Sequence, residues 1–190
     1  MRLIVGISGA TGSIYGARLL EILREKKIET HLIITPPAKQ ILLQETSYSI
    51  QKIENLASHV HDHEDLAASI SSGSFKTDGM VVIPCSIKTL SGIAHSYNEN
   101  LMTRAADVTL KERRRLVLVV RETPLHQGHI ELMLQASRMG AILFPPMPAF
   151  YTHPKTIDDL INHTVGKILD LFGIDHHLFV RWGSPSSKDV

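Results

Sequence analysis

The 190-residue sequence is poor in the features that mark secreted, membrane or nucleic-acid-binding proteins. Its single cysteine, Cys85, excludes a disulfide within the chain and suits a reducing, cytoplasmic compartment. The formal net charge is only +1, which gives no general attraction to nucleic acid or to an anionic membrane. No apolar run approaches the roughly 20 residues that span a bilayer, and the apolar start of the chain is too short for a signal peptide. We therefore expect a cytoplasmic protein that binds no nucleic acid and no membrane.

Apolar residues make up 43% of the chain and follow two alternating patterns. Short continuous runs, typical of parallel strands buried on both faces, occur at 3–7, 30–34, 79–84, 116–120 and 141–144. Helical patterns occur at 14–24, 38–44, 88–94, 101–111, 130–139 and 157–171. Strands separated by helices predict an α/β fold, a doubly wound parallel sheet with helices on both faces.

The chain shows neither an internal repeat nor a linker, so we expect one domain over residues 1–182. The polar, histidine-rich stretch 58–77 is expected to be a loop with some helix. Residues 183–190 are rich in serine and are expected to form a flexible C-terminal tail.

A glycine-rich turn, Gly9-Ala10-Thr11-Gly12, follows the first predicted strand. Ligands of open α/β sheets bind at the carboxyl ends of the strands, and the free N–H groups of a helix N-terminus suit a phosphate. The turn can equally need its glycines for steric reasons alone. Its spacing differs from the dinucleotide fingerprint, so the turn indicates a phosphate without naming a cofactor.

A second junction, Pro84-Cys85-Ser86-Ile87-Lys88-Thr89-Leu90-Ser91, follows the third predicted strand. Lys88 falls in the first turn of a helix, where its charge opposes the helix dipole, and a bound anion would explain it. The alternative is an N-capping Ser86 beside a solvated lysine. Two such junctions in one sheet together favour a ligand.

Two groups of charged residues are further candidates. Arg104 and Lys111 are seven residues apart, near one face of a predicted helix, and can direct cations at an anion or face solvent. Arg121 and Glu122 follow the fourth predicted strand directly, at the ligand edge of the sheet, but a local ion pair explains them too.

The histidines His59, His61 and His63 alternate in sequence within an acidic stretch. Convergence on one metal ion would need an extended segment and a further ligand. We favour a solvated loop and predict no metal site. Cys85 is expected to be a small buried residue at a strand end.

Six stretches resemble, in their joint order, the flavin prenyltransferase (UbiX) family over nearly the whole chain. They are Gly9-Ala10-Thr11-Gly12, Pro84 to Ser91, Arg104-Ala105-Ala106-Asp107-Val108, Leu110-Lys111-Glu112-Arg113, Leu116 to Leu125 and Pro146-Met147-Pro148-Ala149-Phe150-Tyr151. The resemblance implies a Rossmann-like flavoprotein fold and a homo-oligomer, commonly a dodecamer. It also implies a metal-independent transferase that joins the dimethylallyl group of dimethylallyl phosphate to reduced FMN. The prenylated FMN would serve a UbiD-type decarboxylase.

The resemblance also implies site residues. FMN-binding positions would be Gly9, Ala10, Thr11, Thr35, Ser86, Ile87, Lys88, Thr89 and Arg121. Positions that hold dimethylallyl phosphate would be Tyr151 and Lys167. Catalytic positions would be Glu45, Arg104, Lys111, Glu122 and Trp182.

The chemistry agrees with these residue types. A leaving phosphate needs cations, which Lys111, Arg121 and Lys167 can supply. An allyl carbocation needs a dry pocket with aromatic faces, such as those of Trp182 and Tyr151. Proton transfer needs a carboxylate, with Glu45 expected near the flavin and Glu122 near the phosphate.

Two positions depart from the family pattern. Lys167 stands where the family usually has arginine, which keeps the charge but loses the bidentate fork. Thr11 replaces a commoner serine and keeps the hydroxyl.

Three other functions remain open from the sequence. The first is a Cys-peptide or phosphopantothenoylcysteine decarboxylase, but such proteins carry a Pro-Ala-Met-Asn stretch where this chain has 146–151. The second is an aromatic-acid decarboxylase. The third is a non-catalytic FMN-binding subunit, against which the set Glu45, Lys111 and Glu122 argues.

Overall fold

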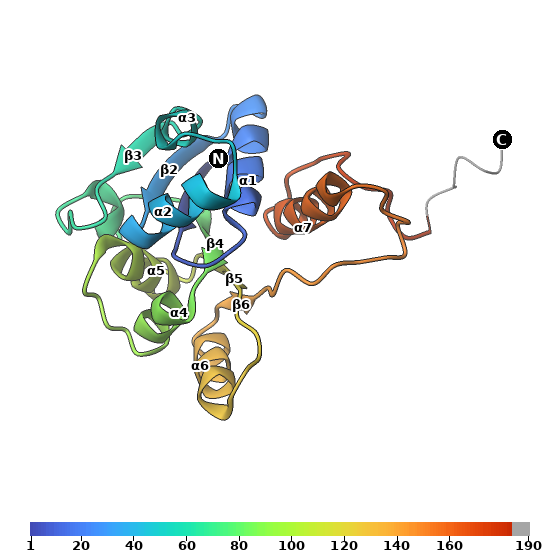
Figure 1. The fold of residues 1–190 in the computed structure, drawn as a ribbon. Coiled ribbons are helices and arrows are strands. Elements are labelled where there is room, and N and C mark those ends of the chain that lie inside the picture. The colour runs from blue at the N-terminus through green and yellow to red at the C-terminus, as the bar shows by residue number, and fades with distance from the viewer. Residues whose placement is uncertain (184–190) are drawn as a thin grey trace. The chain divides into compact units, whose positions relative to one another are not determined.

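The computed structural model describes residues 1–183 and shows two compact units, the first Met1–Pro146 and the second beginning at Met147 (Figure 1). A single domain over residues 1–182 stays a prediction. Of the predicted tail 183–190, Gly183 lies in a turn, and residues 184–190 fall outside the described part of the chain. Within the described part, no helix is long and apolar enough to cross a membrane.

The first unit is built on a six-stranded sheet in the order β3-β2-β1-β4-β5-β6, and every neighbouring pair is parallel. The strands are β1 (Arg2–Ile7), β2 (Glu29–Ile34), β3 (His59–His61), β4 (Gly79–Cys85), β5 (Arg115–Val120) and β6 (Ile142–Leu143). The order reverses between β1 and β4, which is the doubly wound arrangement predicted from the sequence. The carboxyl ends of β1 and β4 therefore flank the crevice where such sheets bind ligands.

Helices cover both faces of this sheet. They are α1 (Ser13–Glu25), α2 (Pro36–Glu45), α3 (Ile50–Glu54), α4 (Ile87–Ala94), α5 (Leu101–Lys111) and α6 (Gln127–Arg138). α1 packs against β1, β2 and β4, whereas α5 packs on β4 and β5 and contacts α4, which contacts α6. The core on the second face joins residues of α4, α5 and α6 to alternate strand residues such as Ile4, Met80 and Leu118.

Two glycines permit close packing of helices on the sheet. A Cβ at Gly6 in β1 would collide with the Met102 side chain of α5. A Cβ at Gly16 in α1 would lie 2.7 Å from the carbonyl oxygen of Ile83 in β4. Gly16 therefore needs a residue without a side chain, whereas a side chain at Gly6 would require the end of Met102 to move.

The stretch 58–77 differs from its prediction. Residues His59–His61 form the edge strand β3, which pairs with β2, and Ser69–Ser71 form a short 3₁₀ helix. The expectation of a loop was wrong here because three residues with only one apolar side chain, Val60, lack the continuous apolar signal of a buried strand. α3 was also missed, since five residues are too few for a helical period to show.

The second unit contains α7 (Ile157–Leu171), which begins at Thr156 with a capping box formed with Asp159. The chain after α7 folds back onto it, because Arg181 donates two hydrogen bonds to Asp170, of 3.0 and 2.7 Å. A Cβ at Gly166 would lie 2.6 Å from the Phe179 ring, so that ring packs directly on the helix backbone.

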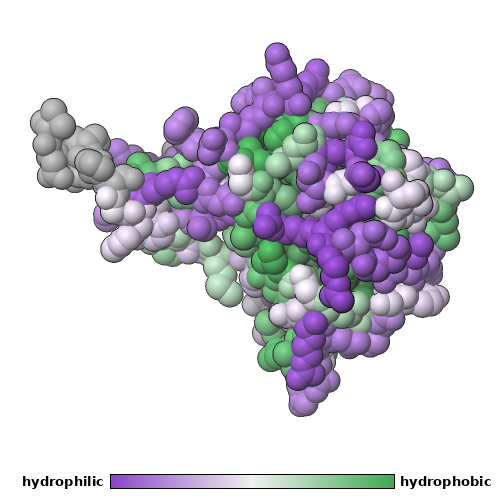
Figure 2. All heavy atoms as spheres, turned by 180° about the vertical axis from the view of Figure 1, so that it is seen from behind, coloured by the Kyte–Doolittle hydropathy of each residue, from purple (hydrophilic) through white to green (hydrophobic). Residues whose placement is uncertain are grey.

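Apolar and polar side chains alternate on the surface. At α6, at the foot of Figure 2, hydrophobic and hydrophilic residues reach the surface side by side. Ile130 and Leu134, one turn apart on this helix, are 56% and 49% exposed. A stripe of this kind suits contact with another protein surface.

Candidate active site

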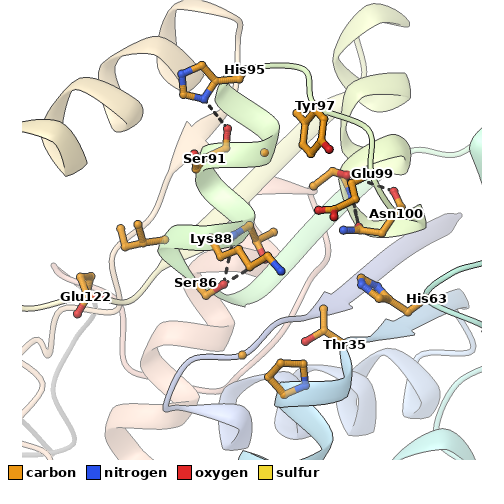
Figure 3. Close-up of a pocket in the computed structure, with 16 residues that line it drawn as sticks. Thr35, His63, Ser86, Lys88, Ser91, His95, Tyr97, Glu99, Asn100 and Glu122 are labelled. Atoms are coloured by element: carbon orange, nitrogen blue, oxygen red, sulfur yellow. Dashed lines mark hydrogen bonds between the residues drawn. The ribbon is translucent and has the colours of Figure 1, made fainter.

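A cavity of about 760 Å³ lies at the carboxyl ends of the strands of the first unit (Figure 3). Its lining comes from the ends of β1, β2 and β5, the segment after β3, the start and one face of α4, and the start of α5. Its volume falls within the range of about 300–1,000 Å³ usual for cofactor and small-molecule sites. The cavity therefore occupies the crevice that the strand order predicts.

Ser8 joins the two strand ends that flank the crevice. Its buried hydroxyl donates to the Pro84 carbonyl at 2.9 Å and accepts from the Ser86 N–H at 2.8 Å. Its own N–H also donates to Pro84, at 3.1 Å. One serine at the end of β1 thus fixes the turn from β4 into α4.

The start of α4 presents hydroxyl groups and a cation to the cavity. Ser86 caps the helix by accepting from the Thr89 N–H at 3.3 Å, and its hydroxyl also bonds the Thr89 hydroxyl at 3.1 Å. Lys88 extends from the first turn toward the side where Thr35 and His63 lie (Figure 3). The Ser86 cap is present and Lys88 is exposed at the cavity wall, so its role in holding an anion stays a prediction.

The glycine turn after β1 contributes Gly9 to the cavity. A Cβ at Gly9 would lie 2.7 Å from the Pro37 Cβ, so a larger residue would push into α2. Ala10 and Thr11 belong to the same turn, and Thr11 is exposed. The turn brings the β1 backbone close to any ligand in the crevice.

Glu45, the last residue of α2, bonds to the start of α1. Its Oε2 accepts from the N–H groups of Gly12 and Ser13, at 2.8 and 3.3 Å. A carboxylate at a helix N-terminus is stabilised by the helix dipole. This carboxylate occupies the N–H groups at α1 that the sequence suggested for phosphate, so the N-terminus of α4 is the better phosphate position.

The β2 side of the cavity carries Thr35 and His63. Thr35 caps α2 by accepting from the Ala38 N–H at 3.3 Å, and its own N–H donates to Ile7 at 3.0 Å. Burial lowers the pKa of His63, whereas the nearby carboxylates Glu64 and Asp62 act against this effect. His63 and Lys88 share this wall of the cavity.

Glu122 lines the cavity from the end of β5, apart from the α4 residues (Figure 3). Its Oε1 accepts from the N–H of Thr123 at 3.0 Å. The exposed Arg121 precedes it, and its backbone N–H donates to the Cys85 carbonyl at 3.1 Å. Cys85 itself is buried, as predicted, and burial raises the pKa of its thiol.

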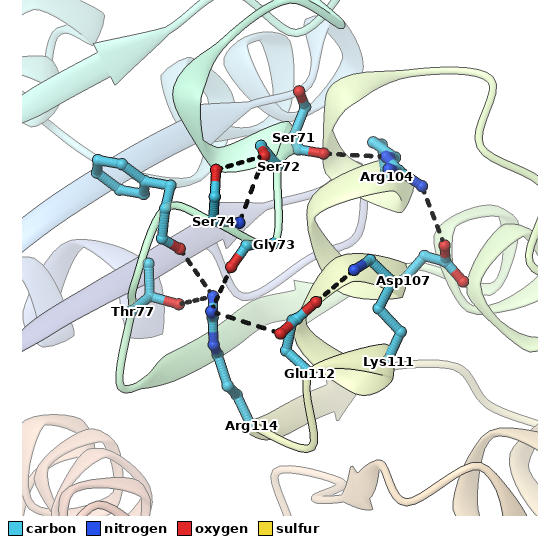
Figure 4. A network of polar contacts seen from close by, with 11 residues as sticks. Ser71, Ser72, Gly73, Ser74, Thr77, Arg104, Asp107, Lys111, Glu112 and Arg114 are labelled. Carbon is cyan, nitrogen blue, oxygen red and sulfur yellow. Dashed lines mark hydrogen bonds and ion pairs between the residues drawn. The ribbon is translucent and has the colours of Figure 1, made fainter.

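Arg104 and Lys111 are not among the described residues that line this cavity. Both belong to a polar network at α5 (Figure 4). Arg104 donates to the Ser71 carbonyl at 3.1 Å and to Asp107 at 3.3 Å. Lys111 pairs with Glu112 at the C-terminal end of α5, which leads into the start of β5. With a rise of about 1.5 Å per residue, ten residues of α5 place Lys111 about 15 Å along the helix axis from Leu101.

The remaining three predicted residues belong to the second unit. Tyr151 and Trp182 pack edge to face, with ring centroids 5.4 Å apart. The Tyr151 hydroxyl is 3.0 Å from the Nε2 of His163. Lys167 points its ammonium toward Asp170, at 3.8 Å. These residues thus form an aromatic and cationic group of their own on α7 and its flanking segments.

Sequence reasoning missed part of the cavity lining. Ser91 and His95 line the cavity from the same helix face as Lys88. The spacing 88, 91, 95 is that of one helical face and is visible in the sequence. Asn100 and Thr103 also line the cavity, where the Asn100 side chain caps α5. Nothing in the sequence around Asn100 distinguishes it from a helix-capping asparagine that lies outside a cavity.

The fold and the cavity define a class: a doubly wound α/β protein with a cavity of cofactor size at its topological switch point. The Flavoprotein family matches residues 1–169. Flavin prenyltransferase UbiX of Salmonella typhimurium is 61% identical over 184 residues, 95% of this chain and 97% of that protein.

Two solved structures are similar over nearly their full lengths. AnUbiX (PadA1) in complex with FMN and dimethylallyl pyrophosphate is 48% identical, with a TM-score of 0.95, and covers 97% of this chain and 98% of that chain. A dodecameric FMN-dependent UbiX-like decarboxylase from Escherichia coli O157:H7 is 54% identical, with a TM-score of 0.94. The match covers 97% of this chain and 100% of that chain. The chain belongs to the flavin prenyltransferase UbiX family.

Proposed function

We propose that the protein joins the dimethylallyl group of dimethylallyl phosphate to reduced FMN and releases phosphate. The observation that carries the proposal is the start of α4, where Lys88 and the capping Ser86 line a cavity at the switch point of the sheet. The 61% identity to a flavin prenyltransferase supports the reaction. The enzyme is accordingly a transferase that uses FMN.

The donor set of the cavity fits FMN. Hydroxyl groups of Ser86, Thr89 and Thr35 and the ammonium of Lys88 suit the phosphate and the ribityl chain. Ile87 and Gly9 offer apolar and open backbone surface to a planar ring. We extend the FMN-binding proposal to Ala10, Thr11 and Arg121, which adjoin these residues in sequence.

When bound, reduced FMN supplies the nucleophilic ring atoms that the allyl group alkylates. We assign Glu122 to proton transfer, because its carboxylate lines the cavity opposite the α4 cation. Glu45 is assigned an orienting role, since its carboxylate holds the glycine turn at the start of α1. Neither role needs a metal ion.

The second unit supplies the allyl-phosphate residues in this proposal. Tyr151 and Trp182 already stack on each other and offer aromatic faces to an allyl cation. Lys167 offers a cation to the leaving phosphate. Its contact with Asp170 would weaken on phosphate binding, because the two anions compete for one ammonium.

Arg104 and Lys111 require a different explanation. Arg104 is committed to Ser71 and Asp107, and Lys111 lies at the far end of α5 from the cavity. A role for them in phosphate release therefore requires the cavity of another copy. We infer a homo-oligomer, a dodecamer by likeness to the Escherichia coli protein, in which the exposed apolar stripe of α6 would be covered.

We further propose that the protein is cytoplasmic and that a UbiD-type decarboxylase receives its product. Incubation with dimethylallyl phosphate and reduced FMN without oxygen should give a filtrate that activates the apo form of such a decarboxylase. The same incubation without the protein should not. Loss of CO₂ from an aromatic acid or a cysteine peptide with this protein alone would favour the decarboxylase alternatives instead.

A further inference from the structure

A cluster of two histidines and a glutamate lies on the two strands at one edge of the sheet. His31 of β2 pairs in register with His59 of β3, so the two side chains share one face. Glu29 lies two residues before His31 on the same face of β2. One ligand atom from each of these three residues lies within 4.8 Å of the other two.

The histidines that alternate in the sequence therefore belong to two different sites in the structure. His63 lines the cavity, whereas His59 joins residues of the neighbouring strand. A metal site required an extended segment and a further ligand. β3 provides the extended segment, and β2 provides two further ligands.

We propose that Glu29, His31 and His59 bind a divalent cation of the zinc type. Two imidazoles and a carboxylate are a ligand set that zinc uses, with solvent in the fourth position. The site would join the edge strand β3 to β2 with one ion.

The spacing of the ligand atoms suits such an ion. Glu29 Oε1 lies 3.1 Å from the Nε2 of His31 and 3.6 Å from the Nε2 of His59. Ligands at about 2.1 Å from a tetrahedral ion are about 3.4 Å from each other. Small side-chain movements would therefore bring all three atoms to the ion.

His61 is placed to orient one of the ligands. Its Nε2 is 2.8 Å from the Nδ1 of His31. If His31 donates its Nδ1 proton to His61, the Nε2 lone pair faces Glu29 and is free for a cation. Metal-bound histidines commonly use their second nitrogen in this way.

Arg2 is the competing cation at this cluster. Its Nε donates to Glu29 Oε1 at 2.8 Å, and its guanidinium also stacks on Phe75 at 4.5 Å from the ring centroid. An ion bound at Oε1 would compete with Arg2 for that oxygen and leave the second carboxylate oxygen to Arg2. The bond to Arg2 then holds the carboxylate in place as an outer partner.

The cluster is separate from the FMN cavity. Glu29 begins β2, whereas Thr35 of the cavity follows the end of that strand, six residues later. At about 3.3 Å per residue this is about 20 Å along the strand. Zinc would accordingly stabilise the fold without entering the prenyl transfer reaction.

Zinc titration of the untagged, metal-free chain tests the proposal, with a fluorescent zinc chelator as competitor. We expect one zinc ion per chain and at least a tenfold weaker association in His59→Ala, whose side chain is 55% exposed and can be removed without opening the core. Glu29→Gln should also weaken it, and His177→Ala, an exposed histidine outside the cluster, should not.

Thermal unfolding provides a second readout, because a ligand that binds only the folded chain raises its melting temperature. Zinc should raise the melting temperature of the wild type and of His177→Ala but not of His59→Ala. Flavin prenylation by His59→Ala should equal that of the wild type. Equal zinc binding by the wild type and His59→Ala, or no binding by the wild type, would overturn the proposal.

Discussion

Glu122 is the residue on which the proposed proton transfer depends. Its carboxylate lines the cavity and accepts a hydrogen bond from Thr123. We expect Glu122→Gln to slow single-turnover prenylation by roughly a hundred- to ten-thousand-fold, the usual contribution of general acid–base catalysis. FMN affinity should stay nearly unchanged, because glutamine keeps the shape and can still accept from Thr123.

The control is Glu25→Gln, which removes an exposed carboxylate at the end of α1. If Glu122 only orders its loop, Glu122→Gln would instead weaken FMN binding and leave turnover of the bound fraction intact. FMN titration followed by single-turnover kinetics separates these two roles.

Lys88 is predicted to be the main cation for the flavin phosphate within the first unit. We expect Lys88→Gln to weaken FMN binding about tenfold or more, since a charged hydrogen bond contributes about 1.5–3 kcal/mol. The salt dependence of FMN binding should also fall. Fluorescence titration of FMN at two salt concentrations measures both effects, with Lys26→Gln at the exposed end of α1 as control. Unchanged FMN affinity in Lys88→Gln would place the phosphate elsewhere.

At the scale of single residues, the sequence predicted that residues directly after strand ends lie at the ligand edge of the sheet, and these residues line the cavity. Ser86, Lys88 and Glu122 come directly after β4 and β5, and the strand edge alone puts them near a ligand. His63 was missed as a cavity residue because the strand two residues before it, β3, was not recognised. The hydrogen bond from α1 to Glu45 links residues 33 positions apart, and no local pattern reveals such a pair.

At the scale of elements, the junction of β1 and β4 depends on Ser8. Ser8→Ala would remove a fully buried hydroxyl and leave the half-buried Ser86 N–H and the Pro84 carbonyl short of a partner, so we expect a loss of about 1–3 kcal/mol in the free energy of unfolding. Urea unfolding measures this loss, and Ser137→Ala at an exposed position of α6 serves as control. FMN binding should weaken too, because the start of α4 is held by this bond. A Ser8→Ala chain as stable as the control would contradict this role.

Long periodic elements could be predicted almost to the residue. The helices at 101–111 and 157–171 agree with α5 and α7 at both ends, since each has a capping residue before a regular apolar pattern. β3 and α3 could not be predicted, because β3 has three residues and α3 has five, which is too few for a periodic pattern to show. β3 owes its place to pairing with β2, a long-range contact.

At the scale of the whole molecule, one buried and one half-buried histidine make stability depend on pH. Burial lowers the pKa of both His63 and His163 from the ordinary value of 6.5, and Lys167 lowers that of His163 further. The unfolded chain then binds protons more readily than the folded chain. Stability from these groups is present above pH 6.5 and is lost as the pH falls through the folded pKa values.

Urea unfolding between pH 7.5 and pH 5 should therefore show a falling free energy of unfolding. His163→Gln keeps a partner for the Tyr151 hydroxyl but does not titrate, so its fall should be smaller. An identical pH dependence in the wild type and His163→Gln would show that His163 does not contribute.

Alkylation of reduced FMN with a dimethylallyl group is the reaction proposed for this chain. The most direct measurement is mass spectrometry of the flavin after anaerobic incubation of the protein with reduced FMN and dimethylallyl phosphate, with a chelator present. We predict FMN heavier by one C5H8 unit, formed with and without the chelator and absent when the protein is omitted. Flavin of unchanged mass, from protein that binds FMN under these conditions, would contradict the account.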